Sequence, residues 1–237
     1  MTTPGLPPVC ILAGGRGTRL GQLAEDTPKP LVMVAGKPFL AHQLGTLARH
    51  GARKVVVCVG YLGERIEAAL GRRFGEVGLE YSYDGDELAG TLGALRNARE
   101  RLGGRFLVLY GDTYLRIDYG GFATAWKASG CMGAMAVLHN AGRWGTSNAS
   151  YAHDRVLSYD KFCPSADMTW IDYGLGGLTT TALDRVPPAE TDLAVLYSAL
   201  AAGDELFGFT ATRRFYEIGT PGALRRTERF LSSPHHG

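Results

Sequence analysis

The segment of the chain with the clearest chemical potential is a glycine-rich stretch near the N-terminus. It reads Leu12-Ala-Gly-Gly-Arg-Gly-Thr-Arg-Leu20 and directly follows a short apolar run. Glycines after a buried strand let backbone N–H groups converge on an anion, because no Cβ blocks the approach. Arg19 and Lys29 add positive charge, the first as a planar fork and the second as a point charge. This combination suits a triphosphate.

Two widespread phosphate-binding loops do not fit this stretch. In Gly15-Arg-Gly-Thr-Arg-Leu20 the third glycine of a dinucleotide fingerprint is replaced by Leu20. No GxxxxGK[ST] pattern occurs in the chain, so a P-loop is excluded as well. The remaining alternative is a glycine-rich turn with solvated basic residues, which leaves the neighbouring Pro28-Lys-Pro30 without a purpose.

Asp112 is the strongest candidate for a metal ligand. It lies just past the apolar run Phe106–Tyr110, where a carboxylate is costly unless it is used. Magnesium takes one or two protein carboxylates together with substrate phosphates, so such a site needs few protein ligands. The alternative is an ordinary turn aspartate after Gly111.

The elements that must position these residues alternate between strands and helices in the first half of the chain. Apolar runs without polar alternation are typical of strands that are covered on both faces. The expected strands are Val9–Ala13, Lys54–Val59, Leu79–Tyr83 and Phe106–Tyr110. The expected helices are Phe39–His50, Glu64–Leu70 and a helix capped by Thr91 that runs to Leu102. This rhythm predicts a doubly wound parallel sheet whose ligand site lies beyond the carboxyl ends of its strands.

The second half of the chain is richer in strands. Strands are expected at 131–138, 155–162, 170–179 and 206–212, with helices at Leu193–Ala201 and from Pro221 onward. No linker or repeat separates the halves. We therefore predict one α/β domain, with a mixed, mostly parallel sheet, helices on both faces, and a more antiparallel second half laid over the sheet edge. Trp126 and Tyr216 would serve either an interface or the core, and homo-oligomer formation is left open.

Composition limits the classes of function. The chain has 237 residues, 45% of them hydrophobic, and Lys+Arg 25 against Asp+Glu 23 gives a net charge of +2. This balance argues against a nucleic-acid binder, and no apolar run approaches the roughly 20 residues of a membrane span. The four cysteines form no CxxC pair, which favours buried free thiols and a reducing, cytoplasmic setting.

Several motifs together resemble one enzyme family. The stretches LAGGRGTRL and TPKPLVMVAGKPFL are similar to the N-terminal signature of the sugar-1-phosphate nucleotidylyltransferases. The resemblance continues in order through Gly90-Thr-Leu-Gly-Ala94, Leu109-Tyr-Gly-Asp112, Ile171-Asp-Tyr-Gly174 and Glu217-Ile-Gly-Thr-Pro221. The compact length is most like that of short bacterial heptose-1-phosphate and mannose-1-phosphate guanylyltransferases.

The resemblance implies a GT-A-like nucleotidyltransferase fold and a reaction. A sugar 1-phosphate oxygen attacks the α-phosphorus of a nucleoside triphosphate and pyrophosphate leaves, so the protein must mainly position two polyanions and neutralise charge.

A disordered lead-in at 1–8 would precede a domain at 9–232, divided into a nucleotide-binding half, 9–115, and a sugar-phosphate-binding half, 116–232. The implied catalytic residues are Arg19, Lys29 and Asp112. The implied nucleotide-binding residues are Leu12, Ala13, Gly14, Gly15, Gly17, Thr18, Glu87, Gly90 and Thr91. The implied sugar-phosphate-binding residues are Gly145, Asp160, Lys161, Asp172 and Gly174.

The chain departs from the family pattern at the implied metal and sugar sites. Glu217 stands where the second Mg²⁺-ligating Asp is expected, so it would bind the metal directly or through water, or else pair with Arg213 or Arg214. Asp160-Lys161 lacks the proline that follows the family's Glu-Lys pair. Asp172 replaces an Asn, which suggests an unusual sugar.

The resemblance favours GTP and a heptose 1-phosphate as substrates, with uridylyl or cytidylyl transfer as alternatives. Two other classes of protein are weighed against this one. A GT-A glycosyltransferase would use Asp84-Gly-Asp86 as its metal motif but would leave Arg19 and Lys29 unexplained. A non-catalytic binding module would account for the changes at Glu217 and Asp172.

Overall fold

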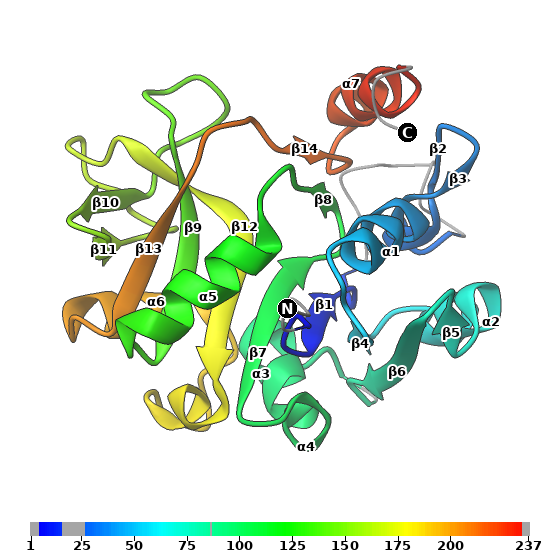
Figure 1. Cartoon of the computed structure of the whole chain (residues 1–237), viewed down its shortest axis with the longest axis horizontal. Helices are drawn as coiled ribbons and strands as arrows, with labels where there is room; N and C mark the ends of the chain where they lie inside the picture. Colours follow the sequence, from blue (N-terminus) through cyan, green and yellow to red (C-terminus); the bar gives the residue numbers. More distant parts are fainter. Residues whose placement is uncertain (1–4, 16–26, 86, 234–237) are drawn as a thin grey trace.

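A ten-stranded mixed sheet forms the centre of the computed structural model, which describes residues 5–15, 27–85 and 87–233. Its strand order is β10-β11-β13-β9-β12-β7-β1-β4-β6-β5 (Figure 1). The strands are β1 Val9–Leu12, β4 Lys54–Val59, β5 Arg73–Phe74, β6 Val77–Tyr83, β7 Arg105–Tyr110, β9 Gly133–His139, β10 Ala149–Ala152, β11 Arg155–Tyr159, β12 Trp170–Thr179 and β13 Leu206–Ala211. Strands β7, β1, β4 and β6 run parallel, which confirms the doubly wound first half.

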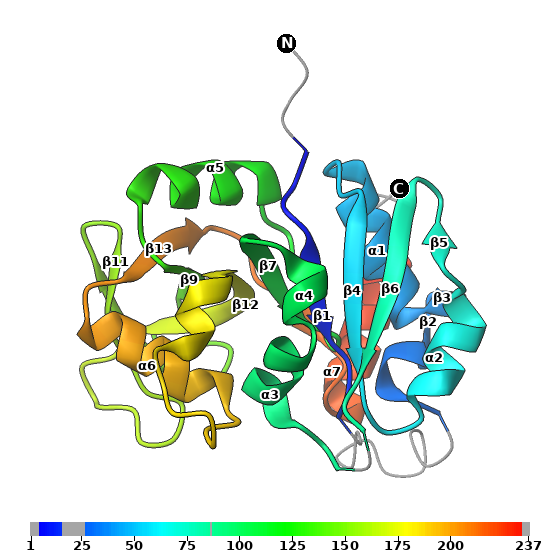
Figure 2. The same ribbon diagram turned by 90° about the horizontal axis from the view of Figure 1, so that it is seen from below.

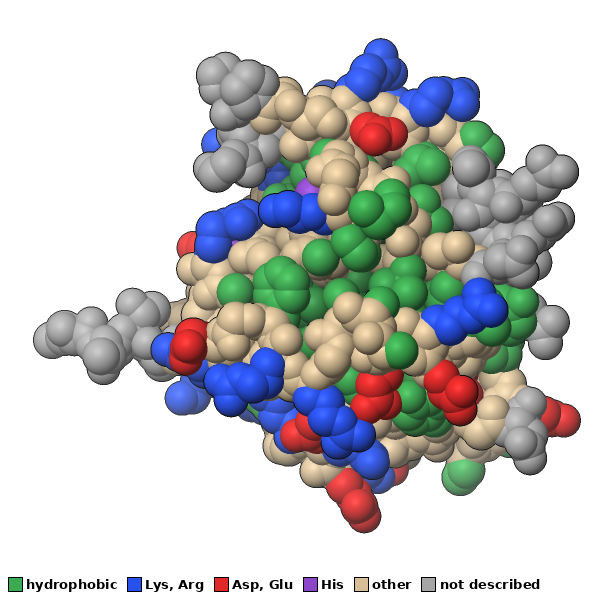
Figure 3. Space-filling model, turned by 90° about the vertical axis from the view of Figure 1, so that its right-hand side faces the viewer, with side chains coloured by type: hydrophobic (Ala, Val, Ile, Leu, Met, Phe, Trp, Pro, Cys, Tyr) green, Lys and Arg blue, Asp and Glu red, His purple; other side chains and the backbone are tan. Residues whose placement is uncertain are grey.

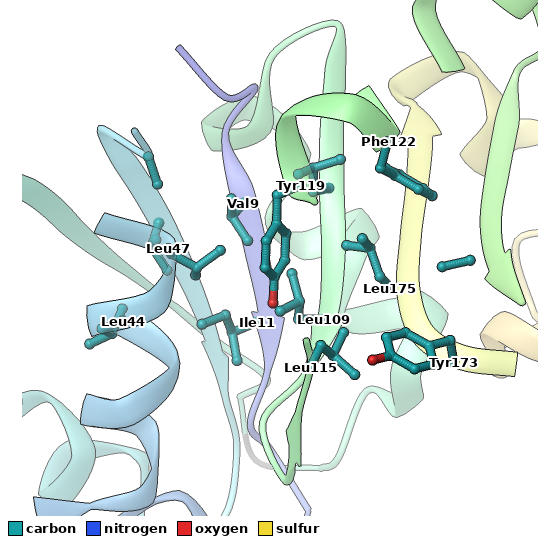
Figure 4. Close-up of a cluster of buried hydrophobic side chains, with 14 of the residues drawn as sticks. Val9, Ile11, Leu44, Leu47, Leu109, Leu115, Tyr119, Phe122, Tyr173 and Leu175 are labelled. Atoms are coloured by element: carbon teal, nitrogen blue, oxygen red, sulfur yellow. The ribbon is translucent and has the colours of Figure 1, made fainter. Parts of the chain in front are cut away.

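Helices cover both faces of this sheet. Successive side chains of a strand point to opposite faces, so each face presents apolar side chains that helices cover. Val9 and Ile11 of β1 belong to one buried cluster, whereas Cys10 between them belongs to the other. Figure 2 shows α5 and α6 on opposite faces, and Figure 4 shows apolar side chains of one cluster meeting between helices and strands. The helices are α1 Phe39–Arg49, α2 Gly63–Leu70, α3 Gly90–Asn97, α4 Arg99–Leu102, α5 Tyr119–Ser129, α6 Leu193–Ala202 and α7 Pro221–Leu231, with 3-10 turns η2 Lys29–Leu31 and η3 Thr180–Asp184.

The second half of the chain extends the sheet, and our prediction that it lies over the sheet edge is wrong. Strand β12 pairs antiparallel with β7 through five residues, Leu175 to Thr179. Strand β9 then pairs antiparallel with β12, and β13 pairs parallel with β9. An exposed edge of β7 would leave a row of unpaired N–H and C=O groups, and direct strand pairing satisfies them. The α/β fold class is confirmed.

The predicted helix from Thr91 to Leu102 is also corrected. Two helices, α3 and α4, occupy that span and meet at Ala98, and Thr91 does not cap either of them. The strand expected at 155–162 ends at Tyr159. Trp126 lies in the core, with 1% of its surface exposed.

A two-stranded ribbon, separate from the main sheet, brings residues 216–217 next to the end of β7. Its strands are β8, Thr113–Tyr114, and β14, Tyr216–Glu217, which pair antiparallel. Ile218 and Tyr114 are buried in a small cluster against α7 and the hairpin formed by β2, Met33–Val34, and β3, Lys37–Pro38. This cluster fixes β14 beside Asp112.

Surface and cysteine features agree with a folded protein of balanced charge. Figure 3 shows a band of hydrophobic side chains across one face, with groups of Lys and Arg side chains above and below it and acidic side chains near them. Cys10, Cys58 and Cys131 are buried free thiols, as expected, and Cys163 is an exposed one. Among the described residues, no helix has the length and apolar character needed to cross a membrane.

Candidate active site

A cavity of about 350 Å³ opens at the carboxyl ends of β1, β4 and β7, where the parallel sheet places its ligand site. Its wall comes from the strand ends, from the segment after β6, and from the first turns of η2 and α3. Gly111 lets β7 approach β1 closely, since a Cβ there would lie 2.9 Å from the Leu12 carbonyl oxygen. The lining residues are Leu12, Ala13, Gly14, Gly15, Lys29, Pro30, Cys58, Asp84, Leu88, Gly90, Thr91, Ala94, Tyr110, Gly111 and Asp112.

Lys29 and Asp112 meet at one end of this cavity. Lys29 Nζ lies 2.5 Å from Asp112 Oδ2, and the Thr113 hydroxyl donates to Asp112 Oδ1 at 3.0 Å. The Lys29 side chain is only 12% exposed and that of Asp112 30%. The prolines that flank Lys29 preset the backbone of η2, so the ammonium group is held at the cavity rather than in bulk solvent.

Glu217 lies beside this pair. Its strand pairs with Thr113, and the Ile218 N–H donates to the Asp112 carbonyl at 3.0 Å. A Cβ on Gly219 would lie 3.2 Å from Glu217 Oε2 and 3.6 Å from Lys29 Nζ, so the carboxylate and the ammonium group flank one point. None of the ion pairs between described residues joins Glu217 to Arg213 or Arg214, so that alternative is wrong.

The two carboxylates fit the requirements of a magnesium ion. Asp112 directly precedes β8, and Thr113 of β8 pairs with Glu217 of β14. Both carboxylates are hard oxygen donors, which magnesium takes together with water and substrate phosphates. The described part of the chain has no group of three or more His, Cys, Asp or Glu side chains arranged for a metal.

Gly90 and Thr91 form the opposite side of the cavity. Gly90 has φ +74°, and a Cβ on it would lie 2.6 Å from the Thr191 carbonyl oxygen, so glycine is required at this close approach. The Thr91 hydroxyl accepts from the Leu193 N–H at 2.8 Å and thus caps α6 rather than its own helix. This contact joins the first turn of α3 to the second half of the chain.

Asp192 is a residue of this region that our sequence reasoning missed. One of its carboxylate oxygens accepts from the Ala194 N–H, and the other lies 3.2 Å from Lys161 Nζ. The available signal was its place directly before the apolar helix Leu193–Ala201, a typical N-cap. Its second contact, with Lys161, depends on the folded chain.

Several predicted nucleotide-binding residues are placed differently or fall outside the structure. Glu87 is exposed and does not line the cavity. Asp84 does line it; burial raises the pKa of this carboxyl, and a hydrogen bond from the Ala89 N–H opposes the shift. Gly17, Thr18, Arg19 and Asp86 lie outside the described residues.

Asp172 lies on β12 where the pairing with β9 shifts register. Its carboxylate accepts from the Gly174 N–H at 2.8 Å and faces the Tyr159 hydroxyl at 3.5 Å. Burial raises the pKa of Asp172 to about 6, and these two hydrogen bonds, with the charge of Lys161, limit the rise. Gly174 has φ +94°, which allows the local turn that directs its N–H to Asp172.

Asp160 and Gly145, two other residues predicted to bind the sugar phosphate, each make contacts of their own. Asp160 accepts from the Phe162 and Cys163 N–H groups, which lower the pKa of its carboxyl, and it does not pair with Lys161. The carbonyl of Gly145 accepts from the side chain of Asn140, a fully buried residue that the sequence reasoning did not single out.

The fold is of the α/β class, with a cavity at the carboxyl ends of its parallel strands, and comparison with known proteins gives the family of the chain. Residues 9–202 match the family described as the MobA-like NTP transferase domain, and the chain belongs to that family. The family resemblance seen in the sequence motifs is thereby confirmed.

Individual relatives agree with this assignment. The chain is 31% identical over 151 residues to the D-glycero-alpha-D-manno-heptose 1-phosphate guanylyltransferase of Campylobacter jejuni, a match that covers 64% of this chain and 66% of the relative. It is 40% identical over 112 residues to the N-acetylmuramate alpha-1-phosphate uridylyltransferase of Neisseria meningitidis, covering 46% and 48%. It therefore spans about half the length of that relative.

A solved structure shows the same fold. HddC from Yersinia pseudotuberculosis, complexed with GMP-PN, aligns with a TM-score of 0.78 over 95% of this chain and 100% of that chain. The sequence identity is 23%, so the likeness concerns the fold.

Proposed function

We propose that the protein transfers a nucleoside monophosphate from a nucleoside triphosphate to a sugar 1-phosphate and releases pyrophosphate. The observation that supports this most directly is the meeting of Lys29 and Asp112 at one end of the cavity, with the carboxylate of Glu217 beside them. A reaction between two polyanions needs positive charge and fixed alignment at the point where they meet. The guanylyl and uridylyl transfer named for relatives points to the same class of reaction.

In this proposal each side of the cavity has a separate task. Backbone at Gly14 and Gly15, with Thr91, contacts the nucleotide, and Arg19 contacts the leaving pyrophosphate. Lys29 donates to phosphate oxygens at the reacting centre. Asp112 and Glu217 would hold Mg²⁺, which supplies charge neutralisation between the two phosphate groups. Lys29 Nζ already lies at Asp112, so Asp112 would share its carboxylate oxygens between this ammonium group and a bound ion.

We favour GTP and a heptose 1-phosphate as substrates, in line with the heptose relative, and the Neisseria relative makes a uridylyl transfer the next choice. The test is a pyrophosphate-release assay with Mg²⁺, four nucleoside triphosphates and a panel of sugar 1-phosphates. We expect release that requires both substrates. A folded protein that releases pyrophosphate with none of these pairs, or that instead consumes a nucleotide sugar, would contradict the proposal.

A further inference from the structure

A second hollow, also of about 350 Å³, lies next to the candidate active site on the side of Glu217. It shares no lining residue with the nucleotide cavity. Its wall comes from the loop after β9, from the segment that enters β14, and from α7. The lining residues are Arg143, Trp144, Arg214, Phe215, Tyr216, Glu217, Ala223, Arg226 and Thr227.

Aromatic rings hold two of the guanidinium groups in this hollow. Arg143 lies 4.6 Å over the ring of Trp144, and its nitrogens donate to the carbonyls of His139 and Asn140. Arg214 lies 4.7 Å over Tyr216, which itself stacks on Phe230 of α7 at 3.8 Å. Stacking fixes the plane of a guanidinium group and leaves N–H donors on its edge for a planar anion.

The charge in the hollow is unbalanced. Three guanidinium groups face one carboxylate, that of Glu217. In the described part of the chain, neither Arg143 nor Arg214 nor Arg226 lies within ion-pair distance of a carboxylate. Side chains fixed in this way, with positive charge that no neighbour neutralises, favour a carboxylate or a phosphate in the hollow.

The position of the hollow connects it with the acceptor rather than with the nucleotide. Trp144 precedes Gly145, and a Cβ on Gly145 would touch Ile171, the neighbour of Asp172. The same loop reaches Asp172 again through Asn148, whose side-chain oxygen accepts from the Asp172 N–H at 2.9 Å. The loop that carries Arg143 thus also carries residues on the sugar side of the candidate site.

We propose that this hollow binds a second anionic group of the acceptor, a carboxylate or a phosphate attached to the sugar away from its 1-phosphate. The inference rests on the proposed function and makes it more specific. The acceptor then carries two anions: one at the reacting centre beside Lys29, and one between Arg214 and Arg226.

Matched pairs of acceptors test this inference. The pairs are glucose 1-phosphate with glucuronate 1-phosphate, N-acetylglucosamine 1-phosphate with N-acetylmuramate 1-phosphate, and mannose 1-phosphate with mannose 1,6-bisphosphate. Each pair differs by one anionic group, and the first two carry a carboxylate where the third carries a phosphate. We expect kcat/KM to be about tenfold higher for the more anionic member of at least one pair, in keeping with a charged hydrogen bond.

Variants then assign that preference to the hollow. Arg214→Gln and Arg226→Gln are each expected to lower the preference about tenfold, whereas Arg225→Gln, on the same helix but outside the hollow, keeps it. Thermal melting monitors folding, and Arg226→Gln, at an exposed residue, decides the question if Arg214→Gln is unstable.

The other outcomes are informative as well. If both members of every pair react equally in the wild-type protein, the second-anion site is refuted and the proposed function stands. If the variants slow both members of a pair by the same factor, the arginines act on a part common to all acceptors or on the leaving pyrophosphate, and the inference fails. If no sugar 1-phosphate reacts, the proposed function fails first.

Discussion

Lys29 is the residue whose removal should separate activity from folding most clearly. We expect Lys29→Ala to lower turnover by about 10²- to 10³-fold, because transition-state charge then lacks its nearest donor. The variant should lose about 1–2 kcal/mol of stability, since Asp112 keeps the Thr113 hydroxyl and partial exposure to water. Lys37→Ala, at an exposed lysine of β3, is the control for charge. Near-normal turnover of Lys29→Ala in the pyrophosphate assay would remove the assignment.

Asp112 and Lys29 could be predicted from the sequence because each has a local signal. Asp112 directly follows an apolar strand, and Lys29 lies between two prolines after the glycine-rich stretch. Asp192 has only its N-cap position as a local signal, since its contact with Lys161 depends on the folded chain, and the burial of Asn140 leaves no chemical signal in the sequence. Local patterns in the sequence therefore predict the charged residues at the end of the cavity better than the residues that support them.

Asp172 should make stability depend on pH. Its pKa is about 6 in the folded protein and near 3.8 in an unfolded chain, so folding favours the protonated carboxyl. Its contribution to stability is then present below pH 4 and is lost as pH rises through 6. We expect the free energy of unfolding of Asp172→Asn, relative to wild type, to increase by about 2 kcal/mol between pH 4 and pH 8.

Urea unfolding at several pH values measures this difference. Glu100→Gln, at an exposed carboxylate of α4, serves as the control for removal of a surface carboxylate. Parallel stability profiles for wild type and Asp172→Asn would show that burial does not raise the pKa of this carboxyl.

At the scale of elements, Arg96 on α3 holds the segment that leads into α6. Its guanidinium group donates to five backbone carbonyls between residues 183 and 190, at 2.6 to 3.3 Å. The segment continues into Thr191, whose carbonyl lies against Gly90, and into Asp192, which accepts a hydrogen bond from the Thr91 hydroxyl at the edge of the cavity. Arg96 does not line the cavity itself, but it positions residues that contact the edge of the cavity.

We expect Arg96→Met to lower the free energy of unfolding by about 2–3 kcal/mol, because several partly buried carbonyls lose their donor. The KM for the nucleotide should rise as well, since Thr91 and Asp192 lose their support. Arg96→Lys should recover only part of both effects, because an ammonium group lacks the planar fork. Urea unfolding and pyrophosphate-release kinetics measure the two effects, with Arg101→Met on the exposed side of α4 as control. If Arg96→Met matched the control, the positioning role would be excluded.

The elements that the sequence did not reveal are short or depend on a distant partner. Strands β8 and β14 have two residues each and exist because they pair with one another. The division between α3 and α4 at Ala98 leaves no mark in the leucine spacing. Long apolar runs such as β4 and β7 were predicted nearly to the residue, because burial on both faces specifies them locally.

At the scale of the whole molecule, one strand connects the two halves of the chain. Strand β12 joins β7 to β9, so its main-chain hydrogen bonds connect the first half of the chain to the second half. The order of the strands in a mixed sheet depends on which strand edges pair with one another, and no local sequence pattern indicates this pairing. This is why strand β12 was predicted with its correct bounds, while its place within the sheet was not.

Gly177 is where β12 leaves room for a helix, and it should be among the least replaceable residues of the fold. A Cβ at this position would lie 2.7 Å from the ring of Trp126, a fully packed side chain of α5, while Tyr197 of α6 packs on the other face beside Gly176. Figure 2 shows these two helices on opposite sides of the sheet. Because neither the ring nor the paired strand can easily shift, we expect Gly177→Ala to lower the free energy of unfolding by about 2–3 kcal/mol.

Gly104→Ala, where an added Cβ meets open space, should change the free energy of unfolding by less than about 0.5 kcal/mol in either direction. Urea unfolding followed by tryptophan fluorescence compares the two variants, and equal stabilities would mean that α5 does not press on the strand that unites the halves.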